Sequence, residues 1–194
     1  MPPNQIVGYA DDFGLAIADR GAVVMTANWR QSDQFSASPA QSVGDVACAV
    51  GVARATGPVY GADASRLVLV GHSNGAWPVS EVGLNPSPAR PEAASCNATS
   101  GSLRPEAIEL MAGSYTQAAN DLVASVPADE HIPVMIAQGG MDKADTVTAA
   151  RSLQTLLAAN SWVSKLVEVP TADHFGILSA PANLDAVMGL TAAY

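Results

Sequence analysis

The chain has little charge, few aromatic residues and almost no cysteine. Charged residues make up 14% of its 194 residues, aromatic residues 5%, and it has two cysteines. Soluble domains average about 25% charged residues, and disordered chains carry more charge and less apolar surface. A chain that is 48% hydrophobic therefore has a buried core, and at about 150 residues per domain we expect a single domain over residues 1–194.

Basic residues are particularly scarce. Nine Lys and Arg stand against 18 Asp and Glu, a net charge of -9 at pH 7, which repels the phosphates of nucleic acids and anionic membranes. No apolar run approaches the about 18 residues of a membrane span, and the start of the chain lacks the layout of a signal peptide. We expect a soluble protein with neither nucleic acid nor membrane as partner. The compartment stays open: cytoplasmic as written, or secreted if a leader precedes residue 1.

The two cysteines, Cys48 and Cys96, lie in neither a CxxC motif nor the neighbourhood of a histidine cluster. A metal site therefore has no support in the sequence. Two small buried thiols are the simpler interpretation, and a disulfide between them is the alternative.

Short β-rich runs alternate with helical stretches along most of the chain. We expect a helix at 42–55, opened by a capping box of Ser42 and Asp45. This alternation predicts an α/β fold, a mostly parallel sheet flanked by helices. The other expected elements are strands at 22–27, 66–71, 132–137 and 165–169, a weaker strand at 93–96, and helices at 11–20, 146–160 and around 184–190.

The clearest motif is Gly-His-Ser-Asn-Gly at residues 71–75, which fits GxSxG. It follows a strand of buried type and precedes a helix, and such a turn holds its serine in a strained, exposed conformation. Side chains at positions 71 and 75 would collide within the turn, which explains both glycines. Ser73 is the candidate nucleophile, and the N–H of Asn74 is the candidate donor to an oxyanion. Pro78, about five residues into the helix, predicts a lost hydrogen bond and a kink.

A serine hydroxyl needs a base to remove its proton, and the chain has three histidines. His174 follows the last expected strand, so its side chain can reach back across the carboxyl edge of the sheet. His131 precedes a strand and belongs at the opposite edge, and His72 is next to the serine with its side chain directed away. We therefore expect His174 to be the base.

The acid that orients this histidine should follow an intervening strand, and Asp142 does so. Asp145 is the competitor, but it is explained as the N-cap of the next helix. Asp173, beside the histidine, points the wrong way. The chain order Ser73, Asp142, His174 is the order found in α/β-hydrolases.

With these residues in place, the chain resembles the α/β-hydrolase superfamily over nearly its whole length. The likeness is greatest to a short, lidless branch of carboxylesterases, feruloyl esterase-like and kynurenine formamidase-like enzymes. Asn-Trp-Arg at 28–30 resembles that branch's Asn-Tyr-Arg, and Asp45 with the turn at 60–66 resembles its lead-in to the nucleophile strand. Asp142 and Asp-His-Phe at 173–175 also match. The resemblance implies hydrolysis of a small-molecule ester through an acyl-serine intermediate, with no metal or organic cofactor.

The sequence departs from that family at its start. The family has an earlier strand that ends in His-Gly-Gly, whose N–H groups supply half of the oxyanion hole. From this resemblance we expect the chain to begin just after that point, as an N-terminally truncated version of the fold. The missing strand of the family lies between those expected at 22–27 and 66–71. Residues 4–9 could fill the gap, another chain could donate a strand, as in a homodimer, the two flanking strands could pair directly, or the sequence is a fragment.

Two tryptophans are candidates for contact with the substrate: Trp77 after the motif and Trp29 at the end of the first expected strand. Ordinary packing is the alternative for each. The short stretch between Ser73 and Asp142 leaves little room for a lid, which favours a shallow site for short acyl chains. The sequence therefore predicts a serine esterase for short-chain esters. The alternatives are an aryl-formamide amidase and a catalytically silent hydrolase fold that serves as a binding module.

Overall fold

The computed structural model describes residues 3–31, 37–88, 96 and 101–193. No helix in these ranges is both long and apolar enough to cross a membrane. The strands are β1 (Val68–His72), β2 (Ala107–Met111), β3 (Val134–Gly139) and β4 (Ser164–Val169). The helices are α1 (Pro3–Ala18), α3 (Pro39–Thr56), α4 (Ala76–Leu84), α5 (Gln117–Ser125), α6 (Ala144–Ala159), α7 (Gly176–Ser179) and α8 (Pro181–Ala193), with 3₁₀ turns at Gly57–Tyr60, Ser73–Gly75 and Ala128–Glu130.

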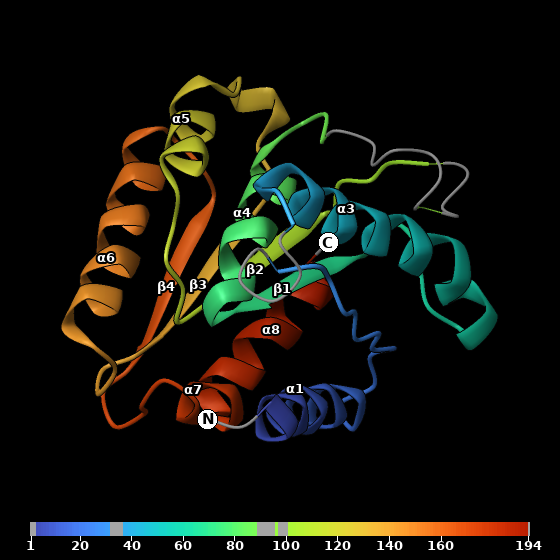
Figure 1. Ribbon diagram of the computed structural model, residues 1–194, viewed down its shortest axis with the longest axis horizontal. Coiled ribbons are helices and arrows are strands. Elements are labelled where there is room, and N and C mark those ends of the chain that lie inside the picture. The colour runs from blue at the N-terminus through green and yellow to red at the C-terminus, as the bar shows by residue number, and fades with distance from the viewer. Residues whose placement is uncertain (1–2, 32–36, 89–95, 97–100, 194) are drawn as a thin grey trace.

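The four strands form one parallel sheet, and their order in space, β1-β2-β3-β4, is their order in the chain (Figure 1). Glu109 in the middle of β2 pairs in register with Val70 of β1 and with Met135 of β3. Parallel neighbours need crossover connections, which here run through helices. The carboxyl ends of all four strands therefore lie along one edge, where open α/β sheets bind their ligands.

Helices cover both faces of the sheet. On one face α3, α4, α5 and α6 share an apolar core with Ile108 of β2 and Ile136 of β3. On the other face α1, α7 and α8 lie together (Figure 1) around Met111 and Met135. Because both faces are covered, every residue of β2 and β3 is buried. The architecture confirms the predicted parallel sheet flanked by helices.

The segment at residues 22–27 is irregular, so the strand predicted there is wrong. Val23 and Met25 are 45% and 43% exposed, while the side chains of Val24 and Thr26 lie close to Gly14 of α1. β-branched residues form a stable strand only beside a pairing partner, and within the described ranges no strand pairs with the outer edge of β1. Residues 4–9 belong to α1, so they do not fill the gap in the sheet, and the two flanking segments do not pair.

Helix α3 begins earlier than expected, and the predicted capping box of Ser42 and Asp45 is wrong. The cap is Ser38, whose side chain and backbone bond reciprocally to Gln41. Ser42 instead donates to the carbonyl oxygen of Arg30 at 2.7 Å. Asp45 accepts hydrogen bonds from the guanidinium and the N–H of Arg30, which hold the pKa of Asp45 below its usual value. These contacts fix the end of the irregular segment to α3.

Cys48 of α3 and Cys96 form a disulfide, so the interpretation as two buried thiols is wrong. Apart from Cys96, the weaker strand candidate at 93–96 lies outside the described residues. Strand β2 and helix α5 were not expected from the sequence. The remaining expected strands and helices are present with somewhat different ends, and α1 extends further toward the N-terminus.

Candidate active site

Ser73 stands at the turn between β1 and α4. Its φ of 55° lies in the left-handed region, which few residues other than glycine adopt. Such strain is concentrated at functional sites. The steric reason predicted for Gly71 is confirmed, because a Cβ there would lie 2.6 Å from the carbonyl oxygen of Gly75. The reason predicted for Gly75 is wrong, since a Cβ there would meet nothing within 4 Å.

The helix that follows starts later than the sequence suggests. Pro78 lies in the first turn of α4 (Ala76–Leu84), where backbone N–H groups have no partner within the helix. The predicted loss of a helical hydrogen bond at Pro78 is therefore wrong. Gly113, just beyond β2, packs against this turn so closely that a Cβ on it would lie 2.3 Å from the Cβ of Ala76. The end of β2 thus supports the turn that carries Ser73.

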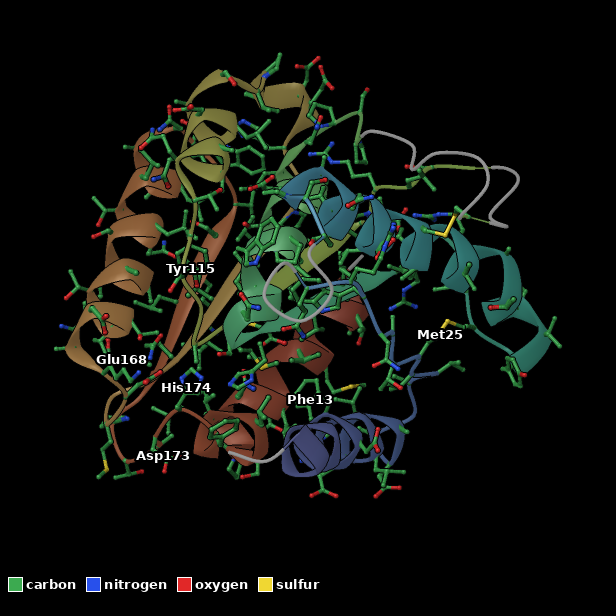
Figure 2. All side chains as sticks on the ribbon, viewed as in Figure 1. Phe13, Met25, Tyr115, Glu168, Asp173 and His174 are labelled. Atoms are coloured by element: carbon green, nitrogen blue, oxygen red, sulfur yellow. A yellow bond between two sulfur atoms is a disulfide. The ribbon has the colours of Figure 1, made fainter. Side chains whose placement is uncertain are left out.

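His174 lies in the loop between β4 and α7 (Figure 2). Its Nε2 is 2.8 Å from the Oγ of Ser73, and its Nδ1 is 2.8 Å from Oδ2 of Asp142. Asp142 comes from the loop between β3 and α6. The structure therefore brings the three residues together in one hydrogen-bonded chain.

The carboxyl group of Asp142 is almost fully enclosed, with 2% of its side chain exposed. Burial raises its pKa, but hydrogen bonds from His174, from the N–H of Lys143 and from the amide of Gln138 outweigh burial, so the net pKa is lowered. Asp142 is a carboxylate at neutral pH and accepts the Nδ1–H of His174. Nε2 then presents its lone pair to the Ser73 hydroxyl. Sequence reasoning did not identify Gln138 as part of the site. The feature that could have indicated it is an amide side chain at the end of an otherwise apolar strand.

The two competing aspartates, Asp145 and Asp173, take no part in the hydrogen bonds that link Ser73, His174 and Asp142. Asp145 lies in the first turn of α6, whose N-cap is Lys143, so the predicted N-cap is wrong. Asp173 turns toward α7 and accepts the N–H of Gly176 at 2.7 Å. In the described parts of the chain, no group of three or more His, Cys, Asp or Glu side chains is arranged to hold a metal ion.

The other two histidines have separate surroundings. His131 lies before β3, as expected, and stacks on Trp162 with ring centroids 3.8 Å apart. His72 was expected to be directed away from the site. It does not contact the Ser73 hydroxyl, but its Nε2 lies 2.8 Å from the carbonyl oxygen of His174. The expectation was thus incomplete, because the ring reaches the main chain of the candidate base.

A hollow of about 630 Å³ opens at the Ser73 hydroxyl, and Trp77 is one of its lining residues. Asn74 also lines it and follows Ser73 in the 3₁₀ turn, where backbone N–H groups lack an intrahelical partner. Trp29 packs edge-on against Trp77 with ring centroids 6.1 Å apart. Trp29 itself is not among the described residues that line the hollow.

The segment after β2 also contributes to the hollow, and sequence reasoning missed it together with the strand. Ala112 and Ser114 are lining residues. Ala112 has a φ of 47°, so a second strained position lies beside Ser73. The available signal was Gly113, a residue typical of strand ends, after a run that is apolar except for Glu109.

No model of a known protein family matches the sequence, and no curated protein matches it either. Solved structures do resemble it. A truncated carbohydrate esterase from gut microbiota matches 93% of this chain and 77% of its own, with a TM-score of 0.78 at 15% identity. Butyrate-bound Est2 from Thermogutta terrifontis matches over 91% and 71%, with a TM-score of 0.65 at 20% identity. Esterase B from Lactobacillus rhamnosis HN001 matches over 94% and 68%, with a TM-score of 0.69 at 14% identity.

At such low identities these likenesses are likenesses of fold. They agree with the parallel sheet and the helices on both of its faces. The chain has the α/β-hydrolase fold.

Proposed function

We propose that this chain is a serine hydrolase that cleaves short-chain carboxylic esters through an acyl-serine intermediate. The observation that carries the proposal is the hydrogen-bonded chain from Ser73 through His174 to Asp142, with 2.8 Å at each step. A serine, a base and an acid in this arrangement are the parts that acyl transfer requires. The neighbours of the same fold are named esterases, which supports this reaction class.

In the proposed mechanism His174 takes the Ser73 proton on Nε2 while Oγ attacks the ester carbonyl. Asp142 keeps the ring oriented and stabilises the imidazolium. The tetrahedral oxyanion accepts the N–H of Asn74, and a donor of this kind contributes about 10²- to 10³-fold in rate. His174 then gives its proton to the leaving alcohol. Water then attacks the acyl-serine while His174 takes a proton from the water. His174 returns this proton to Oγ of Ser73 as the carboxylic acid leaves.

The hollow beside Ser73 has room for a small acyl group. At about 630 Å³ it falls within the usual range of small-molecule sites. The side chain of Met141 lines it and is 68% exposed, so this part of the wall is open to solvent. Est2 binds butyrate and propionate, acids that suit a site of this kind.

Hydrolysis of p-nitrophenyl acetate and butyrate by the purified chain tests the proposal. Ser73→Ala should lose the activity, and Ser152→Ala, on the exposed side of α6, should keep it. A fluorophosphonate should label the wild type and Ser152→Ala, and leave Ser73→Ala unlabelled.

Equal, near-background rates in wild type and Ser73→Ala, with both folded, would overturn the proposal and leave a silent hydrolase scaffold. A clear preference for long-chain esters would overturn the short-chain part alone.

A further inference from the structure

We infer that His72 is a positioning residue for the proposed reaction, which holds the main chain of His174 so that its ring stays within reach of Ser73. The inference rests on the proposed function and adds a residue to it. His72 does not touch the reacting atoms. It acts through the backbone of the base.

The ring of His72 contacts the loop that carries the base. Its Nε2 lies 2.8 Å from the carbonyl oxygen of His174. Its ring lies 4.9 Å from the His174 ring and 5.5 Å from that of Phe175, centroid to centroid. A single side chain of β1 therefore contacts two consecutive residues of the loop after β4.

The direction of the hydrogen bond follows from the charge on the ring. Burial lowers the pKa of His72 to about 4, so the ring is neutral at neutral pH and carries one N–H. A carbonyl oxygen only accepts, and therefore that proton is on Nε2. His72 is a fixed neutral donor to the His174 backbone, and it adds no positive charge beside a base that must itself become cationic.

The bond joins the end of β1 to the loop after β4, which starts from the other outer strand of the sheet. β1 and β4 are the two outer strands, so about three strand spacings of roughly 4.8 Å separate the backbone of Ser73 from that of β4. On its far side the loop is anchored to the end of β3, where Met141 donates its N–H to the carbonyl oxygen of Ala172 at 2.9 Å. His72 supplies the anchor on the Ser73 side.

Side-chain geometry offers a matched set of variants. In glutamine the amide nitrogen is as many bonds from Cβ as Nε2 is in histidine, so His72→Gln can still donate to the His174 carbonyl. In asparagine the amide nitrogen is one bond nearer, so His72→Asn cannot reach it. His72→Phe keeps the ring volume beside Phe175 and removes the donor. Thermal unfolding of each variant checks that it is folded.

We expect His72→Phe and His72→Asn to lower kcat for p-nitrophenyl acetate by about 10- to 100-fold, because displacements near 1 Å at a reacting group have effects of this size. KM should change by less than about threefold, since His72 does not line the hollow. His72→Gln should recover most of kcat. Loss in His72→Gln and His72→Asn without loss in His72→Phe would mean that the ring matters for packing alone. Equal loss in all three variants would mean that donation to the His174 carbonyl is not what positions the base. Either result would overturn the inference.

A second measurement does not depend on hydrolysis. In the Ser73→Ala background, NMR should detect the Nδ1–H of His174, which the hydrogen bond to Asp142 protects from exchange. We expect this signal to broaden or vanish with His72→Phe and to persist with His72→Gln. An unchanged signal in both would overturn the inference. If the wild type showed no Ser73-dependent hydrolysis, the proposed function would fail, while this signal would still report on whether His72 positions His174.

Discussion

Glu109 should make the protein less stable as the pH rises. This glutamate sits in the middle of β2 with none of its surface exposed, and neither carboxyl oxygen has a hydrogen-bond partner among the described residues. Burial raises the pKa of Glu109 well above its usual value. The folded chain therefore keeps a proton on Glu109 that the unfolded chain releases.

The sign and the size of the effect follow from this difference. Above the ordinary glutamate pKa the unfolded state binds fewer protons than the folded state, so the free energy of unfolding falls as the pH rises. Each pH unit costs about 1.36 kcal/mol while the folded carboxyl stays protonated. From pH 5 to pH 7 the contribution of Glu109 is a loss of at most about 3 kcal/mol, reached if the folded carboxyl keeps its proton over the whole range.

Urea unfolding of the oxidised protein at pH 5, 6 and 7 measures this loss. Glu109→Gln removes the titration and keeps the shape of the side chain, so its stability relative to the wild type should grow as the pH rises, by at most about 3 kcal/mol over this range. Glu130→Gln makes the same change on an exposed glutamate and should run parallel to the wild type. If Glu109→Gln also ran parallel to the wild type, Glu109 would be ionised in the folded chain and the reasoning would be refuted.

Two further predictions concern the packing of the turn and the disulfide. Gly113→Ala should destabilise the protein by about 1 to 3 kcal/mol in urea unfolding through overpacking against Ala76, whereas Gly75→Ala, with open space around the added Cβ, should change stability by less than about 0.5 kcal/mol. Equal effects of the two substitutions would contradict this geometry. The disulfide closes a loop with a sequence separation of 48, so replacing Cys48 and Cys96 together by alanine should cost up to about 4 kcal/mol. A reductant should lower the Tm of the wild type and leave that of the double variant unchanged; equal Tm values for the two proteins without reductant would contradict the prediction.

The sequence predicted which side chains lie close together better than it predicted the sheet around them. Ser73, Asp142 and His174 each follow an expected strand, and a parallel sheet brings the ends of its strands to one edge. That rule needs only the existence of the strands and tolerates errors in where they start and end. The N-cap of α6 shows the limit of this rule, because a cap depends on the exact residue at which a helix begins. The predicted cap was Asp145, and the observed cap is Lys143, two residues earlier.

The errors in the sheet have a common physical origin, since strand formation depends on neighbours that are distant in sequence. Residues 22–27 have the composition of a strand, but among the described residues no strand pairs with them. Strand β2 was missed for the opposite reason: Glu109 interrupts the apolar pattern of Ala107–Met111, while the burial of this strand on both faces overrides the residue's preference. A local sequence pattern shows neither whether a strand has a pairing partner nor whether distant segments bury it.

The order of the strands determines when the site can form during folding. Each strand pairs with the next one in the chain, so the sheet can grow by closing loops between neighbouring segments, which loses the least chain entropy. The bond between Ser73 and His174 joins residues 101 positions apart, from the two outer strands of the sheet. It closes only after all four strands have assembled, and a chain that stalls with an incomplete sheet carries Ser73 without its base.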